Sequence, residues 1–325
     1  MALGRPLLLD GGFGTMVQTC GLSEEDFRGY RYRDLPGMML GNNEMLSLTR
    51  PDVVSDIYDS YVSAGVDLLT ANTFSANSIS QADYGCCHLV GEMNRQAVLL
   101  ARQAFRRQGR DGVVVGTVGP TNKSLSISPD IADPARRALT FDQLAKAYEE
   151  QMSFLAEAGV DAIMLETIFD TLNAKAGIYA HSCVEHRLGR HIELMLSFTV
   201  NDASGRILSG QTLEACVISV AHAHAASVGL NCSFGAEEML PALRSLRSIS
   251  TSTAFAAGES GESPWLLSCH PNAGLPNSLG QYDVTPEQFA RSIRPMLDGG
   301  LVDIVGGCCG TTPRHIEMLK EILCR

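Results

Sequence analysis

A junction between the end of a helix and a short apolar strand occurs three times in this sequence, and it limits the folds available to the chain. The three copies span residues 63–69, 157–163 and 298–304. In each copy a glycine can adopt the left-handed conformation that ends a helix. The apolar run that follows is typical of a strand buried on both faces. Helices that alternate with such strands predict a parallel sheet.

Helix start signals support this alternation. Thr140 and Gln143 match a capping box, and an apolar stripe at helical spacing follows them. Thr285 and Gln288 match a second capping box, with Pro286 at the first helical position. We therefore expect regular helices to lead into the strands.

Eight segments have the pattern of buried strands, with helical segments between most of them: 6–10, 66–72, 113–118, 162–166, 193–199, 227–231, 265–269 and 302–306. Eight β/α units predict a single (β/α)8 TIM barrel, whose site would lie at the C-terminal face of the strands. An open doubly wound sheet is the alternative that alternation alone permits. The low-complexity stretch 248–263 is predicted to be a surface loop, so we expect residues 1–325 to form one domain.

Charge and hydropathy exclude two classes of partner. The chain has 25 basic and 36 acidic residues, a net charge of −11, and no cluster of lysine and arginine that would bind nucleic acid. No apolar run approaches the roughly 18 residues that a membrane span needs. The amino-terminal residues do not resemble a signal peptide, so we expect a cytoplasmic location. The ten cysteines, two pairs of them adjacent, then indicate reduced thiols rather than a disulfide scaffold.

Three cysteines follow predicted strands and would meet at one mouth of the barrel. Cys232 follows the sixth strand, and Cys308 and Cys309 follow the eighth. Three thiolates and one open position are typical of a catalytic zinc site that holds a substrate sulfur as a thiolate. Glycines beside Cys308 and Cys309 permit the irregular turn that would aim both sulfurs at one ion. Two alternatives stay open, a buried structural role for Cys232 and a redox role for the adjacent pair.

Other strand ends carry polar residues that suit a free amino acid. Asp10 and Glu166 could hold an ammonium between them, and the amides of Gly11 and Gly12 could bind a carboxylate. Alternatively, Asp10 and Glu166 cap the helices that follow them. Further candidates for the site, from the ends of the second and seventh strands, are Asn72, His270 and Asn272.

Several motifs resemble those of the homocysteine S-methyltransferase family. The first are Leu8–Met16 (LLDGGFGTM), Gly229–Ser233 (GLNCS) and Gly306–His315 (GGCCGTTPRH). Longer segments look like the amino-terminal homocysteine module of cobalamin-dependent methionine synthases: 26–29, 41–43, 119–124, 166–175, 204–211 and 271–277. The resemblance covers nearly the whole chain. At position 70, where the family usually has an acidic residue, this sequence has threonine.

The resemblance implies a (β/α)8 barrel with one zinc ion held by Cys232, Cys308 and Cys309. It also implies that L-homocysteine is the methyl acceptor, bound through Asp10, Gly11, Gly12 and Glu166, with its sulfur as the fourth zinc ligand. Without substrate, we expect the side-chain oxygen of Asn272 to fill that position.

The methyl donor implied by the resemblance is methylcobalamin, carried by a cobalamin-binding module that works with a folate-binding module, neither of which is in this chain. The alternatives are a stand-alone enzyme that uses S-methylmethionine or S-adenosylmethionine, and a zinc-dependent module that binds thiols without turnover.

Overall fold

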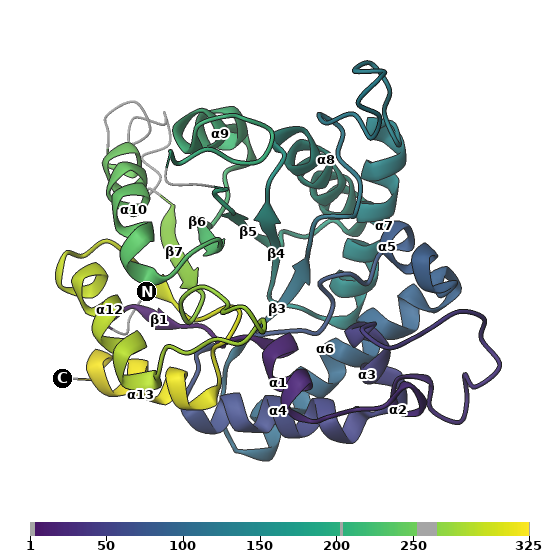
Figure 1. Cartoon of the computed structure of the whole chain (residues 1–325), viewed down its shortest axis with the longest axis horizontal. Helices are drawn as coiled ribbons and strands as arrows, with labels where there is room; N and C mark the ends of the chain where they lie inside the picture. Colours follow the sequence, from purple (N-terminus) through teal and green to yellow (C-terminus); the bar gives the residue numbers. More distant parts are fainter. Residues whose placement is uncertain (1–3, 202–203, 252–264, 325) are drawn as a thin grey trace.

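Eight parallel strands form one ring in the computed structural model, which describes residues 4–201, 204–251 and 265–324 (Figure 1). The order in the sheet is β1-β8-β7-β6-β5-β4-β3-β2, and a parallel bridge between Leu9 and Leu68 joins its two edge strands. The (β/α)8 prediction is therefore confirmed. The strands are β1 (Leu7–Leu8), β2 (Leu68–Thr70), β3 (Val113–Val118), β4 (Ala162–Ile168), β5 (Glu193–Phe198), β6 (Ser227–Cys232), β7 (Leu266–Pro271) and β8 (Ile304–Val305).

A helix follows each strand and covers the outside of the ring (Figure 1). The eight covering helices are α4 (Pro51–Ala64), α6 (Val90–Arg107), α7 (Phe141–Ala158), α8 (Thr171–Leu188), α9 (Leu213–Val220), α10 (Ala236–Ser250), α12 (Pro286–Asp298) and α13 (Pro313–Leu323). Shorter helices before α4 and α6 are α1 (Phe13–Thr19), α2 (Glu24–Arg28), α3 (Leu46–Thr49) and α5 (Ser78–Gln81). Both predicted capping boxes are present, at Thr140 and at Thr285.

One expectation about a loop is wrong. Residues 248–250 belong to the last turn of α10, where Ser250 is buried, so the predicted loop 248–263 does not begin at 248. The apolar residues Leu243 and Leu246 continue the buried face of this helix to its end and outweigh the polar composition. Residues 252–264 lie outside the described residues.

Two apolar layers hold the barrel together. A small cluster fills its interior, and a larger one lies between the strands and the covering helices. Because successive strand residues point to opposite sides, a strand such as β4 contributes Ile163 to the outer layer and Met164 to the inner one. The interior cluster consists of Leu9, Leu68, Val115, Ala162, Met164, Met195 and Ile304.

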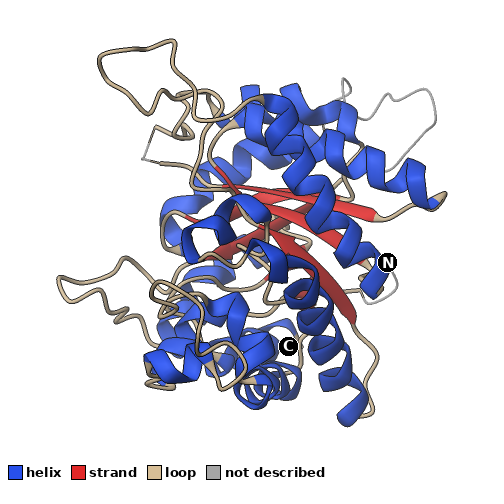
Figure 2. Cartoon of the chain, turned by 90° about the vertical axis from the view of Figure 1, so that its right-hand side faces the viewer, coloured by secondary structure: helices blue, strands red, loops and turns tan. Residues whose placement is uncertain are grey.

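Long loops follow several of the strands. Figure 2 shows two of them, around residues 29–42 and 119–140, projecting to the side opposite the amino terminus. This is the C-terminal face of the strands, where the polar strand ends lie. In the described part of the chain, no helix has the length and apolar character that crossing a membrane requires.

Candidate active site

A cavity of about 640 Å³ opens at the C-terminal mouth of the barrel. The residues predicted for the site that line it are Asp10, Gly11, Gly12, Asn72, Glu166, Cys232, His270, Cys308 and Cys309. Asn272 is not among the lining residues that the structure describes. It lines a neighbouring groove between the start of α10 and α12 instead.

The three predicted cysteines come together. Their sulfur atoms all lie within 4.8 Å of one another, although Cys232 ends β6 and the other two follow β8. Tetrahedral zinc with Zn–S bonds of about 2.3 Å places its sulfurs about 3.8 Å apart. The cluster is therefore close enough for one ion to draw the three sulfurs together. All ten cysteines of the chain are free thiols, including Cys308 and Cys309.

The backbone of Cys232 is in a conformation that few residues other than glycine adopt. Its φ angle is 54°, and that of the next residue, Ser233, is 60°. Hydrogen bonds of the preceding residue, Asn231, hold the backbone in this strained conformation. The side chain of Asn231 accepts hydrogen bonds from the Thr167 N–H at 2.9 Å and the Ser197 hydroxyl at 2.7 Å, and it donates to the Thr167 hydroxyl. Asn231 thus ties the ends of β4, β5 and β6 together beneath the sulfurs.

Glycines let the end of β1 approach the cysteine turn. A Cβ atom on Gly12 would lie 2.6 Å from the carbonyl oxygen of Cys308, and one on Gly307 would lie 2.4 Å from Thr311 Oγ1. The Thr311 hydroxyl donates to the Cys308 carbonyl at 2.6 Å and accepts from the Gly12 N–H at 3.0 Å. The Gly12 amide is thereby engaged inside the protein. Of the two amides expected to bind a carboxylate, only that of Gly11 is left to do so.

Asn272 and Tyr282, which both follow β7, contact Cys309. The Oδ1 of Asn272 accepts a hydrogen bond from the Cys309 N–H at 3.1 Å. Tyr282 lies over the same turn, and its hydroxyl hydrogen-bonds with the Cys309 sulfur. Hydrogen bonds from the thiols of Cys232 and Cys308, and then from Tyr282, lower the pKa of Cys309 below that of a free thiol. The neighbouring thiols and the Tyr282 hydroxyl thus favour a thiolate at this turn.

Asp10 and Glu166 are buried carboxyl groups. Burial raises the pKa of Asp10 to about 7, against two hydrogen bonds from Thr70 that lower it. Burial, then the charges of Asp10 and Cys309, raise the pKa of Glu166 to about 8. Neither residue caps a helix, because Gly12 is the N-cap of α1 and Asp170 that of α8. The capping alternative is therefore wrong.

The cavity lacks a permanent positive charge. Among the described residues that line it there are three carboxyl groups, those of Asp10, Glu44 and Glu166, and no lysine or arginine. Burial lowers the pKa of His270 to about 4, so this imidazole is neutral at physiological pH. A cationic group of a ligand would be the natural counterion for these carboxyl groups.

Asn72 and His270 differ in how free their side chains are. The Asn72 side chain donates to the carbonyl of Asn43 at 2.7 Å and to the Ser47 hydroxyl at 3.2 Å, so it fixes the wall of the cavity. The Nε2 atom of His270 is buried and has no hydrogen-bond partner among the described residues. His270 therefore retains a polar atom for a ligand or a water molecule.

Comparison with known proteins identifies the family of this chain. The family model described as homocysteine S-methyltransferase matches residues 7–323. This chain belongs to the homocysteine S-methyltransferase family. It is therefore a methyltransferase by family, and the resemblance seen in the motifs is confirmed.

Solved structures of a family member have the same fold. The homocysteine methyltransferase MmuM from Escherichia coli in its oxidised form is 20% identical over 98% of this chain and 96% of that chain, with a TM-score of 0.72. Its metallated form is 21% identical over the same shares, again with a TM-score of 0.72. At this level of identity the likeness shows a common fold.

Sequence reasoning assigned no role in this candidate site to four residues: Thr70, Asn231, Tyr282 and Thr311. Asn231 and Thr311 lie within the two cysteine motifs, 229–233 and 306–315, and that position was the available signal. Tyr282 follows β7 by eleven residues, in a loop whose path cannot be predicted from local pattern. Thr70 was noted only as a departure from the family.

Proposed function

We propose that this chain transfers a methyl group to the sulfur of L-homocysteine, producing methionine, with one zinc ion held by Cys232, Cys308 and Cys309. The observation that carries the proposal is the meeting of three sulfurs and two buried carboxyl groups in one cavity. Zinc bound there would act as a Lewis acid that keeps a substrate thiol deprotonated and nucleophilic at neutral pH.

The carboxyl groups would recognise the amino-acid end of the substrate. Asp10 and Glu166 would share its ammonium, whose charge favours the ionised form of both groups. The Gly11 amide, beside the engaged amide of Gly12, would meet the carboxylate. These contacts would orient the substrate with its thiol toward the cysteines.

We propose methylcobalamin, carried by another domain or protein, as the methyl donor. Besides the motifs shared with the synthase module, apolar side chains exposed around the mouth support a protein-borne donor. They stand on the loops after β1, β2, β3 and β7: Tyr30, Met38, Leu40, Phe74, Ile127, Ile131, Leu275 and Leu279. Exposed apolar groups concentrated around a site are typical of a surface that meets another protein.

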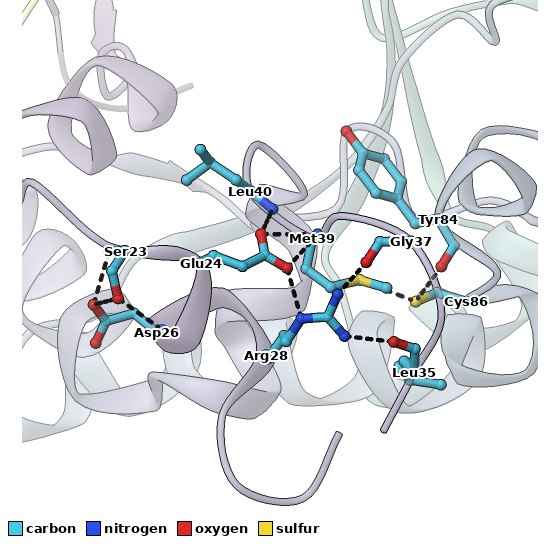
Figure 3. Close-up of polar contacts among 10 residues, drawn as sticks. All are labelled: Ser23, Glu24, Asp26, Arg28, Leu35, Gly37, Met39, Leu40, Tyr84 and Cys86. Atoms are coloured by element: carbon cyan, nitrogen blue, oxygen red, sulfur yellow. Dashed lines mark hydrogen bonds and ion pairs between the residues drawn. The ribbon is translucent and has the colours of Figure 1, made fainter. Parts of the chain in front are cut away.

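The loop that carries three of these side chains is held in place. Figure 3 shows the Glu24 carboxylate accepting the backbone N–H groups of Met39 and Leu40, at 2.9 and 2.6 Å. The Arg28 guanidinium binds Glu24 and donates to the carbonyls of Leu35 and Gly37. A loop anchored in this way presents Met38 and Leu40 in a defined position, as a docking surface requires.

A sulfonium donor, S-methylmethionine or S-adenosylmethionine, is the second candidate. The observation that favours it is the cavity itself, whose lining includes three carboxyl groups and no lysine or arginine among the described residues. Such a cavity would attract a cationic donor.

The deciding experiment supplies zinc-loaded protein with homocysteine and each donor in turn and measures methionine. Transfer from methylcobalamin, free or bound to a cobalamin-binding domain, but not from either sulfonium, supports the first candidate. Rapid transfer from a sulfonium alone supports the second. Tight binding of homocysteine without turnover from any donor would indicate a thiol-binding module.

A further inference from the structure

Thr70 lies against Asp10 at the mouth of the barrel, although the proposed chemistry does not use it. It is the last residue of β2 and lines the same cavity. Its backbone N–H and its hydroxyl both donate to the Oδ2 atom of Asp10, each at 2.8 Å. Two donors from one strand end therefore hold a single carboxylate oxygen.

This contact determines which oxygen of Asp10 a ligand can reach. With Oδ2 bound to Thr70, Oδ1 is the oxygen left to meet a group in the cavity. A carboxylate can otherwise rotate about its terminal torsion, which has a broad energy minimum. Hydrogen bonds to an ionised group are stronger than those between neutral groups, so the pair from Thr70 resists that rotation.

Threonine also determines the charge beside Asp10. An acidic side chain at position 70, as the family resemblance leads one to expect, would bring a second carboxylate against this one. Like charges at contact distance oppose each other's ionisation. The hydroxyl of Thr70 is instead a donor, and Asp10 is left as the acceptor for a cation.

We propose that Thr70 is a positioning residue for the methyl acceptor: it turns Asp10 Oδ1 toward the ammonium of the substrate and thereby sets a preference for α-amino thiols. This inference rests on the proposed function, because it requires that Asp10 meets the ammonium of homocysteine.

The experiment compares two ligands by calorimetry on the zinc-loaded protein. One is L-homocysteine, and the other is 4-mercaptobutyrate, which has the same thiol and carboxylate but no amine. We expect Thr70→Val, which removes the hydroxyl but keeps the shape, to weaken homocysteine binding about tenfold or more. Binding of 4-mercaptobutyrate should not change, and Thr70→Ser should restore the affinity for homocysteine.

A purely structural role gives a different result, in which Thr70→Val weakens both ligands equally or neither. Asp10→Asn is the control, because it should abolish the preference for homocysteine if Asp10 meets the ammonium. With that control in place, either result for Thr70→Val overturns the inference. If the unchanged protein binds the two ligands equally well, the proposed amino-acid receptor fails, and the role of Thr70 fails with it. Zinc content and melting temperature, measured for each variant, identify any that has lost its metal or its fold.

Discussion

The Oδ1 atom of Asn272 accepts a hydrogen bond from the backbone N–H of Cys309 at 3.1 Å. Asn272 follows β7 and Cys309 follows β8, so this contact links the two strand ends next to the sulfur cluster. The oxygen expected as a zinc ligand is therefore already engaged in orienting one of the cysteines. Residues that hydrogen-bond to a metal-ligating residue commonly tune its affinity for the metal.

Substitution Asn272→Ala is expected to weaken zinc binding by about tenfold to a hundredfold while leaving one zinc per chain at saturation. Competition with a chromogenic chelator measures this affinity. Asn277→Ala is the matched control, because that side chain bonds Asp283 in the same loop rather than the cysteine turn. Equal zinc affinity in both variants would refute a role for Asn272.

Metal analysis of the purified chain is expected to return about one zinc. Cys232→Ala, Cys308→Ala and Cys309→Ala should each lose it, because removing one thiolate leaves too few ligands for tight binding. Cys269→Ala should keep it, since Cys269 is buried against Met239 outside the cluster. A metal-free native protein with a bond between Cys308 and Cys309 would instead favour the redox interpretation.

Glu166→Gln is expected to weaken homocysteine binding by about a hundredfold or more and to leave the zinc content unchanged. Loss of one partner from a buried charge pair typically costs several kcal/mol. Calorimetry with zinc-loaded protein measures the effect. Glu44→Gln is the control, because Glu44 is buried in the same cavity but accepts the Ser75 N–H. Unchanged affinity in Glu166→Gln would exclude Glu166 from the receptor.

Glu166→Gln is also expected to make the metal-free, reduced protein more stable than the wild type at alkaline pH. Burial raises the pKa of Glu166 from an ordinary carboxyl value to about 8, so between these values the folded state holds a proton that the unfolded state has released. The wild-type protein therefore loses stability relative to Glu166→Gln as pH rises from about 4.5 to 8. Melting temperatures across this range measure the difference, and a constant difference would contradict the prediction.

Gly12→Ala is expected to destabilise the barrel mouth and weaken zinc binding. Its new Cβ would lie 2.6 Å from the backbone oxygen of Cys308, which must move, and overpacking of this kind typically costs about 1–3 kcal/mol. Gly14→Ala is the control, because the nearest atom to its Cβ is 3.5 Å away and the residue lies within α1. Denaturant unfolding and zinc titration should separate the two variants, and equal behaviour would show that the contact is easily relieved.

The sequence alone was sufficient to predict the barrel and the three cysteines. Glycine helix stops, the capping boxes at Thr140 and Thr285, and buried apolar runs are local signals, readable within a few residues. Once eight parallel strands are predicted, topology places every strand end at one face. Cys232, Cys308 and Cys309 are then predicted neighbours without any knowledge of side-chain contacts.

Only the tertiary structure decided how the polar groups of the site are used. The Gly12 amide is engaged by Thr311, 299 positions later, and Asp10 is held by Thr70, 60 positions later. The loop after β7 turns Asn272 away from the cavity and places Tyr282 over Cys309. A hydrogen bond between distant segments requires that its two atoms are placed to within a few tenths of an ångström. No periodicity in the sequence encodes such a placement.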